Sequence, residues 1–170
     1  MDRDLWPADG DAAPAEERLA ALEAVRAVTD VAYRYARFVD DQDGLGVASL
    51  FLDDGLLFPQ PGVEPLAGRA LIGKLYGKLL PQMTSSTHVV SNPQVTLLSA
   101  DHAVLECVLW AWEGFSDKPS MPPADRYTFG RYRMEMRRSA QGGWLIGRMD
   151  IIFAGQADSG RFAEHLSGRS

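Results

Sequence analysis

Cysteine and histidine are scarce in this chain, and long apolar runs are absent. Cys107 is the single cysteine and there are three histidines in 170 residues, so an internal disulfide and a thiolate metal cluster are both excluded. No apolar run approaches the ~20 residues that span a bilayer. The first residues, 1–4, also lack a basic segment followed by an apolar one. We therefore expect a cytoplasmic protein with no membrane partner.

Positive charge is in deficit as well. Seventeen lysines and arginines stand against 23 aspartates and glutamates, which gives a formal net charge of −6. Such a field repels polyphosphates, so nucleic acid is excluded as an expected partner. We find no glycine-rich phosphate loop and no His, Asp and Glu cluster with metal-ligand spacing. The sequence thus predicts a protein that needs neither a cofactor nor a metal.

What the chain does contain is enough apolar material for the core of one domain, since 46% of its residues are hydrophobic and four are tryptophans. Residues 1–15 combine Pro, Ala, Asp and Gly without apolar periodicity, and we expect them to form a flexible N-terminal arm. We assign residues 16–156 to the single domain. Residues 157–170 are expected to be a polar C-terminal tail.

The first half of the domain has helical periodicity. Apolar residues recur at steps of three and four over 16–39, which predicts a long amphipathic helix. A short helix over about 45–52, capped by Asp43, and a third helix over about 69–80 follow. Between them, 56–58 is typical of a brief strand ended by Pro59.

The second half changes to the composition of strands. The segments at about 86–98, 103–113, 126–138 and 143–154 are rich in β-branched and aromatic residues and are separated by turn residues or by a loop over 114–125. Four long strands in succession predict an antiparallel meander. A curved sheet with three helices against one face is an α+β fold, and the space between the layers can stay open as a pocket.

Five segments in this order resemble the SnoaL-like branch of the nuclear transport factor two superfamily, over about residues 18–154. They are residues 35–43, 50–54, 66–69, the pair Thr87-His88, and 130–132 together with Gly143-Trp144. The resemblance implies a cone-shaped domain with a curved antiparallel sheet, three helices on its concave face, and a homodimeric or homotrimeric assembly. The superfamily includes dehydratases, isomerases, cyclases and noncatalytic subunits, so the fold alone does not give the function.

His88 is the strongest candidate for chemistry. It lies at the start of the first long strand, where alternation puts Val90 and Asn92 on its face. From the residues alone, a buried structural histidine is the more ordinary interpretation. The resemblance to scytalone dehydratase and bile-acid dehydratases implies instead that His88 forms a dyad with Asp40 at the end of the first helix. Such a dyad could remove a proton next to a carbonyl and return it to a leaving hydroxyl.

A tyrosine hydroxyl is the natural partner of the carbonyl oxygen, and the first helix contains two tyrosines. On an ideal helix, Tyr33 lies about 20° from Asp40 and Tyr35 about 140° away. The family pattern places the catalytic tyrosine at Tyr35, which we adopt, with Tyr33 kept as a pocket residue. The complete expected substrate pocket is Tyr33, Phe58, Tyr76, Asn92, Trp110 and Tyr132.

The sequence therefore favours a cofactor-independent dehydratase or isomerase for a small, apolar, cyclic carbonyl compound. A noncatalytic ligand-binding or assembly domain is the alternative from another class. A polyketide-type cyclase, with Glu106 or Asp54 as its acid, is the third. The position matching the ketosteroid isomerase base falls at or next to Pro59, which argues against that route. Trp110 and Trp112 share one strand face, where they could line the pocket or pack against a partner.

Overall fold

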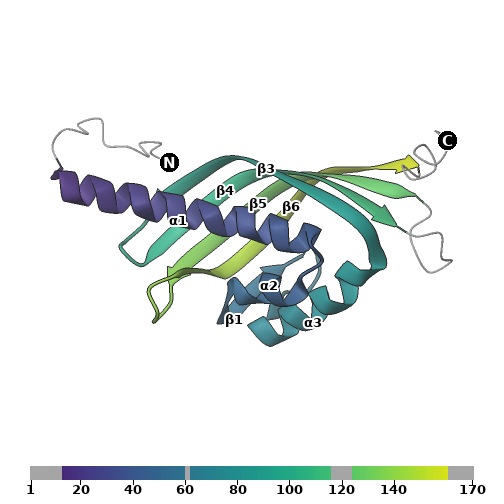
Figure 1. The fold of residues 1–170 in the computed structure, drawn as a ribbon, viewed down its shortest axis with the longest axis horizontal. Coiled ribbons are helices and arrows are strands. Elements are labelled where there is room, and N and C mark those ends of the chain that lie inside the picture. The colour runs from purple at the N-terminus through teal and green to yellow at the C-terminus, as the bar shows by residue number, and fades with distance from the viewer. Residues whose placement is uncertain (1–12, 60–61, 116–123, 161–170) are drawn as a thin grey trace.

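A long helix crosses the concave side of a strongly curved sheet, and two shorter helices lie below its C-terminal half (Figure 1). The computed structural model describes residues 13–59, 62–115 and 124–160. Most of the expected N-terminal arm, the centre of the 114–125 loop and the end of the C-terminal tail lie outside these residues. The predicted α+β class, with three helices and a curved, unclosed sheet, is confirmed.

The first helix, α1 (Ala15–Asp40), matches the predicted range 16–39 to within one residue at each end. Its buried stripe has the helical spacing seen in the sequence: Ala24, Val28, Val31, Ala32, Tyr35, Ala36 and Val39. Leu19 and Leu22, earlier on the same helix, are exposed, so the apolar contact with the sheet begins only at Ala24. Within the described residues, no helix is both long and apolar enough to cross a bilayer.

The two short helices, α2 (Gly44–Ser49) and α3 (Arg69–Leu79), pack on each other. Asp43 caps α2 as predicted, because its side chain accepts a hydrogen bond from the Gly46 amide at 2.7 Å. A β-carbon at Gly44 would lie 2.9 Å from the Gly77 amide nitrogen, so glycine is what permits this close helix contact. A 3-10 turn (Leu80–Gln82) then leads from α3 into the sheet.

The sheet has six strands in the order β2-β1-β6-β5-β4-β3. Their bounds are β1 (Phe51–Phe58), β2 (Leu66–Ala67), β3 (Met83–Leu97), β4 (His102–Phe115), β5 (Asp125–Arg138) and β6 (Trp144–Gly160). Strands β3 to β6 form the predicted antiparallel meander. Strand β1, however, pairs with β6 in parallel, so the sheet is not antiparallel throughout.

Two predicted boundaries were wrong. The second helix does not reach residue 52, because Phe51 already pairs with Ile146 of β6 and starts a strand longer than the expected 56–58. At the other end, β6 stays paired with β5 as far as Gly160. The expected tail from residue 157 therefore begins as strand.

The side chains of strand β4 alternate between the core and the outer face of the sheet. Its inward side chains are Ala103, Leu105, Cys107, Leu109 and Ala111, all buried, and they alternate with more exposed outward ones. Cys107 is the small core residue that the sequence predicted, and burial raises the pKa of its thiol to about 11.

A β-bulge in β3 breaks the expected alternation. Ser91 pairs with Val108 and Gln94 with Glu106, so two residues of β3 stand opposite one of β4. Asn92 lies at this bulge in the left-handed region, with φ 51°, and is exposed. The expectation that Asn92 shares the face of His88 was therefore wrong, because the extra residue reverses the phase of the strand.

Candidate functional site

A cavity of about 500 Å³ lies between the helices and the concave face of the sheet, a size suited to a small organic ligand. Helices α1 and α3 and the turn after α3 contribute Tyr35, Val39, Leu75, Tyr76, Leu79 and Leu80, and β1 is followed by Pro59. The strands contribute Met83, His88, Leu109, Ala111, Glu113, Arg126, Thr128, Tyr132, Ile151, Phe153, Ala154, Gly155 and Gln156. Twelve of these twenty residues are apolar or glycine, and the other eight carry polar side chains.

His88, which lines the cavity, is hydrogen-bonded to Asp40, which lines an outer groove between α1 and β3. His88 Nδ1 lies 2.7 Å from Asp40 Oδ1, and the His88 backbone amide donates to Asp40 Oδ2 at 2.9 Å. The Ser86 hydroxyl also donates to Asp40 Oδ1 at 2.9 Å. The side chain of His88 is 7% exposed and that of Asp40 is 23% exposed. The last residue of α1 is thus held against the edge strand β3 by three hydrogen bonds.

These contacts set the charge of the carboxyl group. Burial on its own raises the pKa of Asp40, but the hydrogen bonds from the His88 ring, the His88 amide and Ser86, with the charge on His88, outweigh it. The net pKa of Asp40 is therefore lower than that of an ordinary aspartate. Asp40 is consequently an anion at neutral pH and acts as a hydrogen-bond acceptor.

The same contact fixes the orientation of the imidazole. A neutral His88 ring that faces an ionised Asp40 carries its proton on Nδ1. This leaves Nε2 with its lone pair as the nitrogen available to a ligand, since His88 lines the cavity. A carboxylate that orients a histidine in this way is the arrangement found in acid/base dyads.

Three tyrosines from three different elements surround the cavity. The hydroxyls of Tyr35 on α1 and Tyr76 on α3 are hydrogen-bonded at 2.5 Å, and the rings of Tyr35 and Tyr132 on β5 pack edge to face at 5.4 Å. Burial raises the pKa of Tyr35 and Tyr132 well above the ordinary range and that of Tyr76 to about 12. All three phenols are therefore neutral hydrogen-bond donors at physiological pH.

The first helix presents Tyr35 and Tyr33 to different surroundings. Tyr35 points into the core and the cavity, whereas Tyr33 is 46% exposed. Tyr33 lines an outer groove between α1 and β3, together with Arg34, Ala36, Arg37, Asp40, His88, Val89 and Val90. Tyr33 therefore does not line the cavity, although it borders Asp40 and His88 in the outer groove. The angular proximity of Tyr33 to Asp40 holds in the structure, because both line this groove, but Asp40 does not line the cavity.

Two more expected pocket residues lie elsewhere. Trp110 is 44% exposed on the convex face, where its ring stacks with those of Tyr127 and Phe129. Phe58 is outside the cavity wall, and the Arg148 guanidinium lies over its ring at 4.1 Å. Alternation placed Trp110 and Trp112 correctly on one strand face, but that face points away from the helices. Tyr76 and Tyr132, by contrast, line the cavity as expected.

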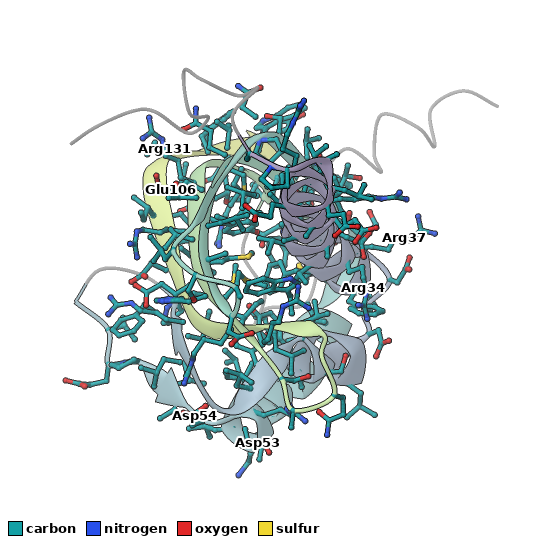
Figure 2. The ribbon with its side chains drawn as sticks, turned by 90° about the vertical axis from the view of Figure 1, so that its left-hand side faces the viewer. Arg34, Arg37, Asp53, Asp54, Glu106 and Arg131 are labelled. Atoms are coloured by element: carbon teal, nitrogen blue, oxygen red, sulfur yellow. The ribbon has the colours of Figure 1, made fainter. Side chains whose placement is uncertain are left out.

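The acids considered for a cyclase are also remote from the cavity. Figure 2 shows Glu106 beside Arg131 on the outer side of the sheet, and Asp53 and Asp54 at the far lower end. Glu106 approaches Arg133 at 3.7 Å and Asp54 approaches Arg137 at 3.3 Å. Neither carboxylate lines the cavity. Pro59 does line it and has no ionisable side chain.

Sequence reasoning missed five polar residues of the site: Ser86, Glu113, Arg126, Thr128 and Gln156. Ser86 and Glu113 had a usable signal, because each is two positions from an inward residue, His88 or Ala111. Arg126 and Gln156 had none, since strand ends bordering a long loop have no clear phase. Within the described residues, no group of three or more His, Cys, Asp or Glu side chains could hold a metal ion.

Solved structures with the same fold include three with informative names. A protein provisionally named a scytalone dehydratase, from Novosphingobium aromaticivorans, has a TM-score of 0.73 at 20% identity, covering 82% of this chain and 90% of that one. A hexachlorocyclohexane dehydrochlorinase from Novosphingobium barchaimii has a TM-score of 0.72 at 17% identity, covering 84% of this chain and 94% of that one. A ketosteroid isomerase-like protein from Erwinia carotovora atroseptica has a TM-score of 0.65 at 19% identity, covering 78% of this chain and 98% of that one.

At these identities the structural likeness establishes the fold. A comparison with curated protein sequences finds no match. The model of the SnoaL-like domain matches residues 20–150, which is most of the chain and nearly all of the described domain. The resemblance inferred from the sequence is confirmed, and this chain belongs to the SnoaL-like domain family.

Proposed function

We propose that this protein is a cofactor-independent lyase, a dehydratase that acts on a small, mostly apolar, cyclic carbonyl compound. The observation that supports this is the 2.7 Å contact between Asp40 and His88 at the wall of the cavity. Proteins of this fold with dehydratase, dehydrochlorinase and isomerase names support the same reaction class. Those names denote eliminations and an isomerisation, reactions that a base can begin by removing a proton from carbon.

In the proposed reaction, His88 Nε2 removes a proton from the carbon next to the substrate carbonyl. The electron pair of that C–H bond forms an enolate, and the resulting imidazolium is stabilised by the Asp40 carboxylate. The enolate then expels the hydroxyl group from the neighbouring carbon as a C=C bond forms. That hydroxyl takes the proton from Nε2 and leaves as water, so His88 returns to its neutral form.

The tyrosines would stabilise the enolate oxygen. Because the Tyr35 and Tyr76 hydroxyls share one hydrogen bond, one of their two protons remains available for a ligand oxygen. Donors that are already positioned in a water-poor cavity stabilise developing negative charge without reorganisation. Tyr35 is the tyrosine we assign to this role, with Tyr76 as the residue that orients it.

The experiment that tests this proposal follows proton removal directly. Incubated with 4-phenylcyclohexanone in D₂O, the protein should accelerate exchange of the protons next to the carbonyl, as measured by NMR. His88→Ala should abolish the acceleration. His102→Ala is the matched control, since His102 begins β4 outside the cavity wall, and it should exchange at the wild-type rate. Binding of the ketone without any exchange would favour the noncatalytic ligand-binding domain instead.

A further inference from the structure

Four polar side chains on the sheet side of the cavity take no part in the proposed reaction. Glu113 of β4 and Arg126 of β5 are directly paired across the two strands, and Thr128 of β5 is paired with Gln156 of β6. Residues paired in this way point to the same face of a sheet. All four line the cavity. They form a cluster, which we call the sheet-side subsite.

The register places this subsite away from the reacting nitrogen. His88 pairs with Ala111, so Glu113 is its diagonal neighbour, about 7–8 Å away between backbone positions. Arg126 and Thr128 lie on β5, two strands from β3, which corresponds to about 10 Å. A ligand with its reacting carbon at His88 would therefore meet the subsite with its opposite end.

The electrostatics of the subsite are mixed. Burial is the main cause of the raised pKa values of Tyr35, Tyr76 and Tyr132, and the negative charge of Glu113 adds to the shift in all three. Glu113 is therefore within electrostatic reach of the tyrosine hydroxyls. Within the described residues it forms no ion pair, although Arg126 is its strand neighbour.

The guanidinium of Arg126 is held by other contacts. With the amide oxygen of Gln156 turned toward it, Arg126 donates from Nε at 2.8 Å and from Nη1 at 3.3 Å. Its other side packs on the Phe115 ring at 5.4 Å. The strand partners of Arg126 are both acidic, Glu113 on β4 and Asp158 on β6. Its positive charge is thus compensated by neighbours that it does not directly contact.

From this arrangement we infer that Glu113 and Arg126 determine substrate specificity, by binding a neutral hydroxyl group at the end of the substrate opposite its reacting carbon. The inference rests on the proposed function for the position of that carbon. A hydroxyl can donate to Glu113 and accept from Arg126 at once, so it satisfies both groups. A carboxylate would meet one cation flanked by two anions, and an apolar group would offer Glu113 no hydrogen-bond donor.

Three probes with one skeleton test the inference. They are 4-phenylcyclohexanone, 4-(4-hydroxyphenyl)cyclohexanone and 4-(4-oxocyclohexyl)benzoic acid, with binding to the whole protein measured by calorimetry. The hydroxyl compound should bind roughly 10-fold more tightly than the unsubstituted ketone, as expected for a hydrogen bond to a charged group. The carboxylate should bind more weakly than either. Tightest binding by the carboxylate, or equal binding of all three, would overturn the inference.

Variants then assign the preference to the subsite. Glu113→Gln keeps the size of the side chain and removes its charge, so the preference for the hydroxyl compound should fall to about 3-fold or less. Glu106→Gln is the matched control, because Glu106 lies on the same strand but on the outer face, and it should keep the full preference. A Glu113→Gln protein that is folded and keeps the wild-type preference would overturn the role of Glu113.

The two proposals can fail separately. His88→Ala should lose proton exchange and keep the probe preference, whereas Glu113→Gln should lose the preference whatever its rate of exchange. If Glu113→Gln does not fold, as judged by circular dichroism, the wild-type series alone still decides the inference. If the wild-type protein shows no proton exchange but prefers the hydroxyl compound, the dehydratase proposal is refuted and the inference about the sheet-side subsite is supported.

Discussion

The two faces of β4 have similar apolar patterns and opposite roles. Facing the helices, Leu109 and Ala111 are buried and lead to Glu113 in the cavity. Facing away, Val108 and Trp110 are exposed on the convex side. The richer aromatic face is therefore the outer one, and the cavity face uses small and medium side chains. Bulky rings would fill the space that a ligand needs, so the number of aromatic residues is a poor guide to a pocket.

The difference is electrostatic as well as steric. On the convex side, charged groups are paired and open to water, as Arg133 and Glu106 are at 3.7 Å, with side chains 36% and 52% exposed. On the helix side, His88 lines the cavity together with buried tyrosines, and it is bound to Asp40, which accepts three hydrogen bonds. Exposed ion pairs contribute little to stability, while groups in a water-poor cavity interact strongly. We therefore expect substitutions on the two faces to have effects of very different size.

The largest expected effect is the loss of the dyad. His88→Ala and Asp40→Asn should each lower the turnover of a hydroxylated ketone by about 100- to 10,000-fold. The turnover of the double variant should be little lower than that of the less active single variant, because a histidine and the carboxylate that orients it act as one unit. The measurement is a double-mutant cycle on turnover, with circular dichroism to confirm folding. Full activity of His88→Ala would refute the proposed mechanism.

A smaller effect should separate the two tyrosines of α1. Tyr35→Phe removes a donor from the cavity and should lower turnover roughly 10-fold, the value of one hydrogen bond. Tyr33→Phe is the matched control on the exposed side of the same helix, and it should leave turnover unchanged. The opposite result would place the reacting carbonyl in the outer groove.

Alkaline pH should destabilise the cavity face. The folded state holds the tyrosine protons more tightly, because the pKa of Tyr76 is about 12 and those of Tyr35 and Tyr132 are also raised. Their contribution to the free energy of unfolding is fully present below pH ~10, the unfolded value. It is lost as the pH rises from there through the folded pKa. Urea midpoints between pH 8 and 11.5 should fall, and Tyr76→Phe should make that fall shallower. An identical pH profile for Tyr76→Phe would contradict this assignment.

The smallest effect on catalysis is expected on the convex face. Trp110→Ser replaces a stacked, half-exposed indole and should leave turnover within assay error. If this face joins the subunits of the homodimer or homotrimer that we expect, the same variant should sediment as a smaller species. If Trp110→Ser loses turnover while its oligomeric state is unchanged, the expectation that the convex face takes no part in catalysis is wrong.

Local patterns in the sequence were sufficient for most of the fold. The period of α1, the four long strands and the Asp43 cap all follow from short-range chemistry and are confirmed. The parallel pairing of β1 with β6 was not predictable, because it joins segments about 90 positions apart. Nor could alternation say which face of a strand points to the helices.

The candidate site was only partly predictable. Family resemblance singled out Asp40, His88 and Tyr35; in the structure His88 and Tyr35 line one cavity, and Asp40 is hydrogen-bonded to His88 from the outer groove. Arg126 and Gln156 could not be found in this way, because their position depends on strand pairing at the open end of the sheet. Their contact with each other depends on side-chain direction, which is set by the assembled sheet.

The bulge at Asn92 makes the length of β3 as constrained as its composition. Before the bulge, His88 and Val90 face inward, and after it Val95 and Leu97 do so. Val90 and Val95 are an odd number of positions apart, so they share a face only because the bulge absorbs one residue. An insertion or deletion of one residue elsewhere in the strand would turn one half outward, whereas deletion of one residue at the bulge would leave both halves facing the helices in a regular strand. Homologous chains that lack the bulge should therefore be one residue shorter between residues 90 and 95.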